Sequence, residues 1–117
     1  MNPEQNGYQT EGDKFMMLPA NLRRCLWMVA HERMRQDEKW GGPEHDDLHT
    51  TADFAQLAQD YAGWARVMAG MGSADKAQRR MLQVAALALA DVERAMRCFD
   101  AAIEADARNE ELAARTA

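Results

Sequence analysis

The fold is decided by residues 81–96, which read MLQVAALALADVERAM. The run from Val84 to Ala90 within this stretch is apolar on nearly every face of a helix. A helix that is apolar all round must be covered on several sides. The stretch therefore predicts a long helix, expected over residues 74–105, at the centre of the fold.

Two more helices are predicted before this one. Residues 20–40 carry apolar side chains at helical spacing, and the Gly-Gly-Pro sequence of residues 41–43 is a typical stop signal. Residues 51–69 repeat an apolar side chain every three or four positions. Residues 41–50 are expected to form the loop between these two helices.

The start of the second helix has a recognisable signal. Thr50 followed by Asp53 resembles a capping box, in which side chains satisfy the free N–H groups of the first turn. Gly63 lies inside the same helix, where glycine costs up to about 1 kcal/mol. A tight helix crossing or a close ligand would explain why glycine is tolerated there.

These patterns predict an all-α protein, with three main helices in an antiparallel bundle. Three helices cover the apolar centre of the third poorly, so we expect a homodimer with the second and third helices at its interface. The chain is divided into a flexible N-terminal arm (1–18), a helical domain (19–106) and a C-terminal tail (107–117).

Composition narrows the class of protein. The chain has 117 residues and a formal net charge of −5, which gives no general electrostatic help in binding nucleic acid. No apolar run approaches the roughly 20 residues of a membrane helix, and no secretory signal is apparent. Cys25 and Cys98 are expected to be buried free thiols, as suits a reducing cytoplasm.

Polar residues gather at the end of the first helix, and one buried glutamine is expected on the third. Their types suit a nucleotide-binding site, with guanidinium and ammonium groups for phosphates, an amide for a base edge and an indole for stacking. The alternative is a solvated helix face with internal ion pairs. The candidate substrate-binding residues are Glu32, Arg33, Arg35, Gln36, Lys39, Trp40 and Gln83.

The loop after this helix is also rich in possible ligands. Asp46 and Asp47 offer carboxylate oxygens, which suit Mg²⁺ or Mn²⁺, and His45 and His49 could coordinate a transition metal. The same carboxylates would also be favourable beside a helix N-terminus with no metal present. We expect Arg33, Gln36 and Trp40 to form one site with this loop, held either by a metal or by an Arg–Asp ion pair.

A family resemblance rests on these residues. Residues 32–41, ERMRQDEKWG, with a histidine shortly after them, resemble the opening of small phage and prophage MazG-like proteins. Residues 82–88, LQVAALA, are similar to the last core helix of that family. The resemblance implies an all-α oligomer that cleaves nucleoside triphosphates to a monophosphate and pyrophosphate. Two pairs of carboxylates hold Mg²⁺ in that family.

The acidic motifs of the family are incomplete in this chain. The stretch that matches the first, residues 60–64, reads DYAGW and keeps only Asp60. The stretch that matches the second, residues 80–83, reads RMLQ and has no carboxylate. If the protein is an enzyme, the catalytic acids would be Asp46, Asp47 and Asp60, with Mg²⁺ or Mn²⁺.

Two functions follow from these observations. The first is a nucleotide-handling protein that binds a nucleotide, with or without hydrolysis. The alternative is a non-enzymatic phage-type protein that binds a host protein through its helical surface. Because Arg80 and Gln83 replace acids of the family, binding is favoured over hydrolysis.

Overall fold

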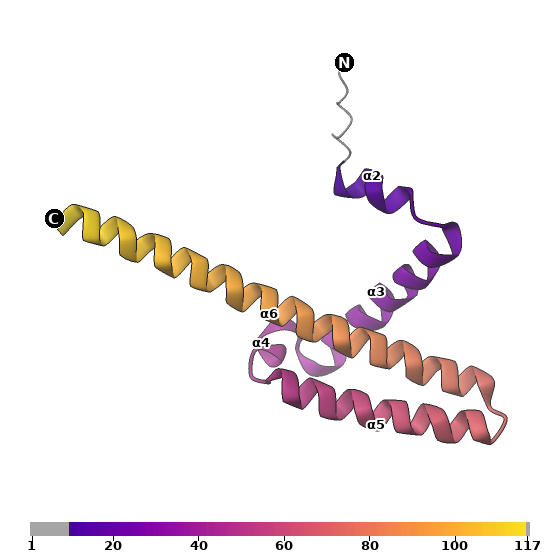
Figure 1. The fold of residues 1–117 in the computed structure, drawn as a ribbon. Coiled ribbons are helices and arrows are strands. Elements are labelled where there is room, and N and C mark those ends of the chain that lie inside the picture. The colour runs from indigo at the N-terminus through magenta and orange to yellow at the C-terminus, as the bar shows by residue number, and fades with distance from the viewer. Residues whose placement is uncertain (1–9, 117) are drawn as a thin grey trace, which may run out of the picture.

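The structure, a computed structural model, describes residues 10–116 (Figure 1). All the secondary structure in this range is helical, which confirms the all-α prediction. The helices are α2 (Glu11–Met16), α3 (Ala20–Trp40), α4 (Gly42–Asp46), α5 (Thr51–Gly70) and α6 (Ala74–Thr116).

Three of these helices match the predicted ones, and the differences lie at their ends. The third predicted helix continues to Thr116, so the expected tail is part of α6. Residues 1–9 of the expected arm lie outside the described residues, and the rest of the arm contains α2. The predicted loop 41–50 was wrong in its first half, because α4 forms there with Pro43 in its first turn, where proline has no N–H to leave unpaired.

The expected antiparallel three-helix bundle is not what the structure shows. α5 and α6 form an antiparallel hairpin, and α3 crosses α6 near its middle (Figure 1). The N-terminal half of α3 and the C-terminal half of α6 extend away from this crossing in different directions (Figure 1). The radius of gyration is 19.8 Å, against about 13 Å for a compact domain of this size.

The core lies where α3, α4 and α5 meet the middle of α6. Leu87 is 1% exposed and packs with Phe54 and Ala90. Ala86 is also fully buried, and its small side chain lets neighbouring helices approach closely. The apolar run of α6 is thus covered on one side within the chain, by α5 and α3, while Leu89 stays exposed on the other side.

Two local expectations are corrected by the structure. Cys25 and Cys98 are exposed thiols rather than buried ones, because they lie on the parts of α3 and α6 that extend past the core. A side chain added at Gly63 would meet nothing within 4 Å, so no tight helix crossing explains this glycine.

The predicted capping box at the start of α5 is confirmed. The Thr50 hydroxyl accepts from the Asp53 backbone N–H at 3.2 Å, and the Asp53 carboxylate accepts from the Thr50 backbone N–H at 2.9 Å. This last hydrogen bond, aided by His49, lowers the pKa of the Asp53 carboxyl below its ordinary value of 3.8. The cap fixes where α5 begins, directly after the segment that carries His45 and Asp46.

We expect Thr50→Ala to lower the free energy of unfolding by about 1 kcal/mol, because an N–H of the first turn loses its acceptor. The Asp53 carboxylate stabilises the fold above its unfolded pKa, so this contribution should be lost as the pH falls below about 4. Melting curves at pH 7 and pH 3 measure both effects. Asp53→Asn should reduce the difference in melting temperature between pH 7 and pH 3. Asp100→Asn, at an exposed carboxylate of α6, should leave that difference unchanged.

Candidate functional site

Arg33 is a buried residue of α3 that contacts both α4 and α6, and it is only 6% exposed. Its Nη2 atom donates to Asp46 Oδ2 of α4 at 2.8 Å, and its Nε atom lies 3.4 Å from Glu93 Oε1 of α6. Its Nη1 atom donates to Asp37, one turn further along α3. Burial opposes the charge of Arg33, but the hydrogen bond to Asp37 and the nearby carboxylates together raise its pKa.

The turn after α3 brings these groups together. Gly41 has a φ of 104°, a left-handed conformation that glycine adopts easily, and its N–H donates to the Asp37 carbonyl at 2.8 Å. The chain therefore reverses at once, and α4 lies back against α3. Asp46 is carried opposite Arg33 and is 5% exposed. This is the Arg–Asp ion pair that the sequence predicts as one of two ways to hold the loop.

A cavity of about 500 Å³ lies next to this ion pair, between the end of α3, α4, the first turns of α5 and the middle of α6. Its wall is mostly apolar, with carboxylates and one amide among the apolar groups. The lining residues are Trp40, His45, Asp46, His49, Asp53, Phe54, Gln56, Leu57, Asp60 and Leu87.

Four aromatic rings follow one another along the wall of the cavity. The rings of Trp40 and His45 are stacked, with centroids 6.4 Å apart and planes 29° apart. The His45 and His49 centroids are 4.7 Å apart, and the His49 and Phe54 rings meet edge to face at 6.3 Å. Aromatic faces of this kind favour a planar, apolar or π-rich ligand.

The polar groups of the cavity are chiefly acceptors of hydrogen bonds. The Asp46 and Asp60 carboxylates line it, and Asp60 accepts from Gln56 Nε2 at 3.2 Å. His45 Nδ1 is buried and has no hydrogen-bond partner within residues 10–116, since it lies 3.6 Å from Asp46 Oδ1. A ligand that brings N–H groups would therefore find partners on this wall.

The expected phosphate-binding guanidinium groups are occupied by carboxylates. Arg33 is held by Asp37, Asp46 and Glu93, as described above. Arg35 Nε donates to Glu32 Oε1 at 2.9 Å, on a face of α3 that does not line the cavity. Lys39 lies closer to the cavity than Arg35 does, because its Nζ atom is 5.5 Å from the centroid of the Trp40 ring, which lines the cavity.

The two candidate glutamines, Gln36 and Gln83, do not line the cavity. Gln36 is 2% exposed, and its Nε2 atom donates to the backbone carbonyl of Gln83 at 3.4 Å. The Gln83 side chain accepts from Arg80 Nη1 at 3.1 Å. Gln36 therefore joins α3 to α6, whereas the Gln83 side chain bonds within α6, and the cavity wall includes neither of these two amides.

The expected metal ligands do not form one set. Asp46 faces Arg33, whereas Asp47 Oδ1 accepts from Arg97 Nη2 on α6 at 2.8 Å. Throughout the described part of the chain, no three His, Cys, Asp or Glu side chains are close enough to hold a metal ion. The residues present do not fit a resident Mg²⁺ or Mn²⁺ at this loop.

Several wall residues were not singled out as site residues from the sequence. Phe54, Leu57 and Leu87 read as ordinary members of apolar helix stripes. The signal that could have identified Phe54 and Leu57 is the capping box at Thr50, because it places the first turns of α5 directly after the His–Asp segment. No local pattern indicates that Leu87, on α6, reaches the same cavity.

No helix within residues 10–116 combines the length and apolar character needed to cross a membrane. Comparison of the chain with protein-family models, with curated proteins and with solved structures found no match in any of the three.

Proposed function

We propose that the protein binds a nucleotide, with the base held in the aromatic cavity, and does not hydrolyse it. The observation that supports this most is the row of rings from Trp40 to Phe54 along a cavity of about 500 Å³. Pockets for small ligands commonly have volumes of roughly 300–1,000 Å³ and mostly apolar walls with a few polar groups. A nucleobase fits this description, because it is flat and carries polar groups at its edge.

The polar groups indicate which bases are favoured. Carboxylates accept hydrogen bonds and cannot donate them when ionised. Asp46 and Asp60 would therefore favour bases with an exocyclic amino group at the edge, as in cytosine, adenine or guanine. A carboxylate that accepts from the amino group of cytosine is a known recognition pair.

The phosphates would lie outside the cavity. Asp46, Asp53 and Asp60 on its wall repel an anion, and Arg33 is already held by three carboxylates. Lys39, above the ring of Trp40, is the cation beside the aromatic wall. The proposed ligand therefore enters base first, with its phosphate next to Lys39.

Binding without hydrolysis is favoured by the placement of the acids. A MazG-like pyrophosphohydrolase needs paired carboxylates that share a metal ion. Here Asp60 hydrogen bonds to Gln56, and Asp46 and Asp47 are held by different arginines. The positions that match the second acidic motif, Arg80 and Gln83, are hydrogen-bonded to each other.

We expect Trp40→Ala to weaken nucleotide binding by about 5- to 150-fold, because stacking on one aromatic side chain contributes about 1–3 kcal/mol per base. Isothermal titration calorimetry with AMP, CMP, GMP and UMP measures this, in buffers with and without Mg²⁺. Trp27→Ala is the matched control, since Trp27 is an exposed tryptophan of the same helix that does not line the cavity.

Two results would contradict nucleotide binding in this cavity. One is no heat of binding for any of the four nucleotides at millimolar concentration. The other is an equal loss of affinity in the Trp27 and Trp40 variants. Release of pyrophosphate from nucleoside triphosphates in the presence of Mg²⁺ would show that the protein is an enzyme after all.

The homodimer is part of the same proposal, and the exposed apolar surface of the chain supports it. Large apolar side chains of α3 and α6 remain exposed, including Trp27 and Phe99. The same surface is the observation that favours the alternative function, binding of a host protein.

A further inference from the structure

An apolar stripe runs along the side of α6 that faces away from the core. Its members are separated by alternating steps of four and three residues, from Ala85 to Ile103. The stripe is exposed along its whole length, with Val92 53% and Phe99 67% exposed. The six residues are Ala85, Leu89, Val92, Met96, Phe99 and Ile103.

This spacing is the repeat of a coiled coil. Apolar side chains every 3.5 residues on average form a seam that another helix with the same repeat can cover. Ala85 and Ile103 are 18 residues apart, so the stripe is about 27 Å long. Contiguous apolar surface of this kind on a soluble protein marks a contact surface. The residues that pack against α5 and α3, such as Leu87 and Ala90, lie on the other side of the helix.

We propose that a second copy of this chain covers the stripe, with the two α6 helices antiparallel. In the matching register, Val92 packs beside the partner's Met96, Leu89 beside the partner's Phe99 and Ala85 beside the partner's Ile103. A two-fold axis then passes near residue 94, and each of these contacts occurs twice. The chain thus supplies a partner helix of the same repeat and length.

The charges along α6 select the antiparallel direction. Residues 74–83 carry three basic side chains and one acidic one, whereas residues 100–111 carry five acidic side chains and one basic one. Arg80 lies over the Tyr61 and Trp64 rings of α5, on the other side of α6, so the direction of the pair depends on the acidic residues that continue the stripe. In a parallel pair, Asp106 and Glu110, which continue the repeat, would each meet their own copy across the seam and repel it.

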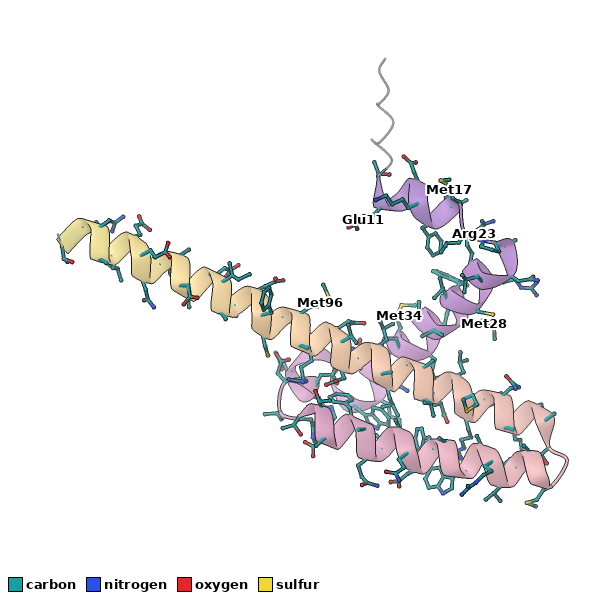
Figure 2. All side chains as sticks on the ribbon, in the orientation of Figure 1. Glu11, Met17, Arg23, Met28, Met34 and Met96 are labelled. Atoms are coloured by element: carbon teal, nitrogen blue, oxygen red, sulfur yellow. The ribbon has the colours of Figure 1, made fainter. Side chains whose placement is uncertain are left out.

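The shape of the protomer leaves room for this partner. Met34 of α3 and Met96 of α6 both project into the angle between the two helices, and α2 and the first half of α3 stand away from α6 (Figure 2). Leu22 and Leu26 on this part of α3 are also exposed. A second α6 in this angle would cover surface that the extended protomer leaves open to water.

The interface differs from the one that the sequence predicts. The sequence predicts the second and third helices at the interface, because three helices cover the apolar run Val84 to Ala90 poorly within one chain. In the structure, α5 packs against one side of that run. The proposed interface therefore uses the opposite side of α6 and continues beyond Ala90 to Ile103.

Sedimentation equilibrium at tens of micromolar tests the proposal. The wild type is expected to have twice the 13.2 kDa mass of one chain. Met96→Asp with Phe99→Asp is expected to raise the dimer dissociation constant by about 100-fold or more, because both substitutions act at the centre of the interface and each counts twice. Leu112→Asp is the matched control, since Leu112 is an exposed leucine of α6 that lies off the stripe.

Disulfide crosslinking tests the direction of the helices without relying on destabilised variants. In a background with Cys25→Ser and Cys98→Ser, a mixture of Ala85→Cys and Ile103→Cys chains is expected to form the mixed disulfide. Ile103→Cys alone should not form one, because the two copies of residue 103 lie about 27 Å apart along the seam. A parallel pair would give the reverse result.

The outcomes separate this proposal from the nucleotide-binding proposal. The antiparallel seam is overturned if the wild type is a monomer, or if the Met96 and Phe99 substitutions leave the dimer intact. In either case, a protein of another sequence would be the partner that covers the apolar surface. Crosslinking of residue 103 to itself also overturns it. Nucleotide affinity of the Met96 and Phe99 variant is expected to be unchanged, because the cavity lies on the other side of α6.

Discussion

Replacing Arg33 with methionine is expected to lower the free energy of unfolding by about 3–5 kcal/mol, which is the usual cost of removing one member of a buried ion pair. Methionine keeps most of the apolar volume of the side chain, so the loss reports mainly the charge. Asp46, which is 5% exposed, would lose its nearest cation. Urea denaturation followed by circular dichroism at pH 7 and one fixed protein concentration measures the change.

The control for this variant comes from the same helix. Arg24→Met removes an exposed arginine of α3, and we expect it to change the free energy of unfolding by no more than about 0.5 kcal/mol. A double variant, Arg33→Met with Asp46→Leu, removes both buried charges and should recover part of the loss. A loss below about 1 kcal/mol in Arg33→Met would show that the ion pair is not what holds α4 against α3.

Leu87→Ala is the second substitution with a large expected effect. Leu87 is 1% exposed and packs between α5 and α6, so truncation leaves a void that we expect to cost about 2–5 kcal/mol. The measurement is the same denaturation curve. Leu112→Ala makes the identical change on the same helix at a site that is 55% exposed, and its effect should be within about 0.5 kcal/mol.

If Leu87→Ala lowers the free energy of unfolding no more than Leu112→Ala does, Leu87 is not packed between α5 and α6. The same variant also informs on the cavity, because Leu87 lines it. A well-folded Leu87→Ala protein that binds nucleotides as tightly as the wild type would show that the ligand does not reach α6.

The sequence predicts the helices well because the signals that begin and end them are local. Gly41 at the end of α3 and the Thr50–Asp53 box at the start of α5 act within one turn of the chain, and both are formed as expected. The short helix α4 was missed because only five residues carry it, and Pro43 reads equally well as part of a loop.

The placement of the candidate site residues could be predicted only in part. Arg33 and Asp46 are brought together by a turn that the sequence makes plain, so their ion pair was among the expected alternatives. Arg35, Gln36 and Gln83 have the residue types of a binding site, but their directions depend on how α3 crosses α6. That crossing depends on packing between residues far apart in the sequence, for which no local pattern exists.

The separation of these contacts along the chain has a consequence for how the molecule folds. α5 and α6 are joined by a turn of three residues and can pair as soon as both are helical, whereas the contact between Arg33 and Glu93 closes a loop of sixty residues. The entropy of closing a loop grows with its length, so local pairs form before distant ones. We infer that α3 docks last, on a hairpin that is already formed. The cavity is lined by residues of α3, α4, α5 and α6, so it is complete only once α3 and α4 have docked on the hairpin.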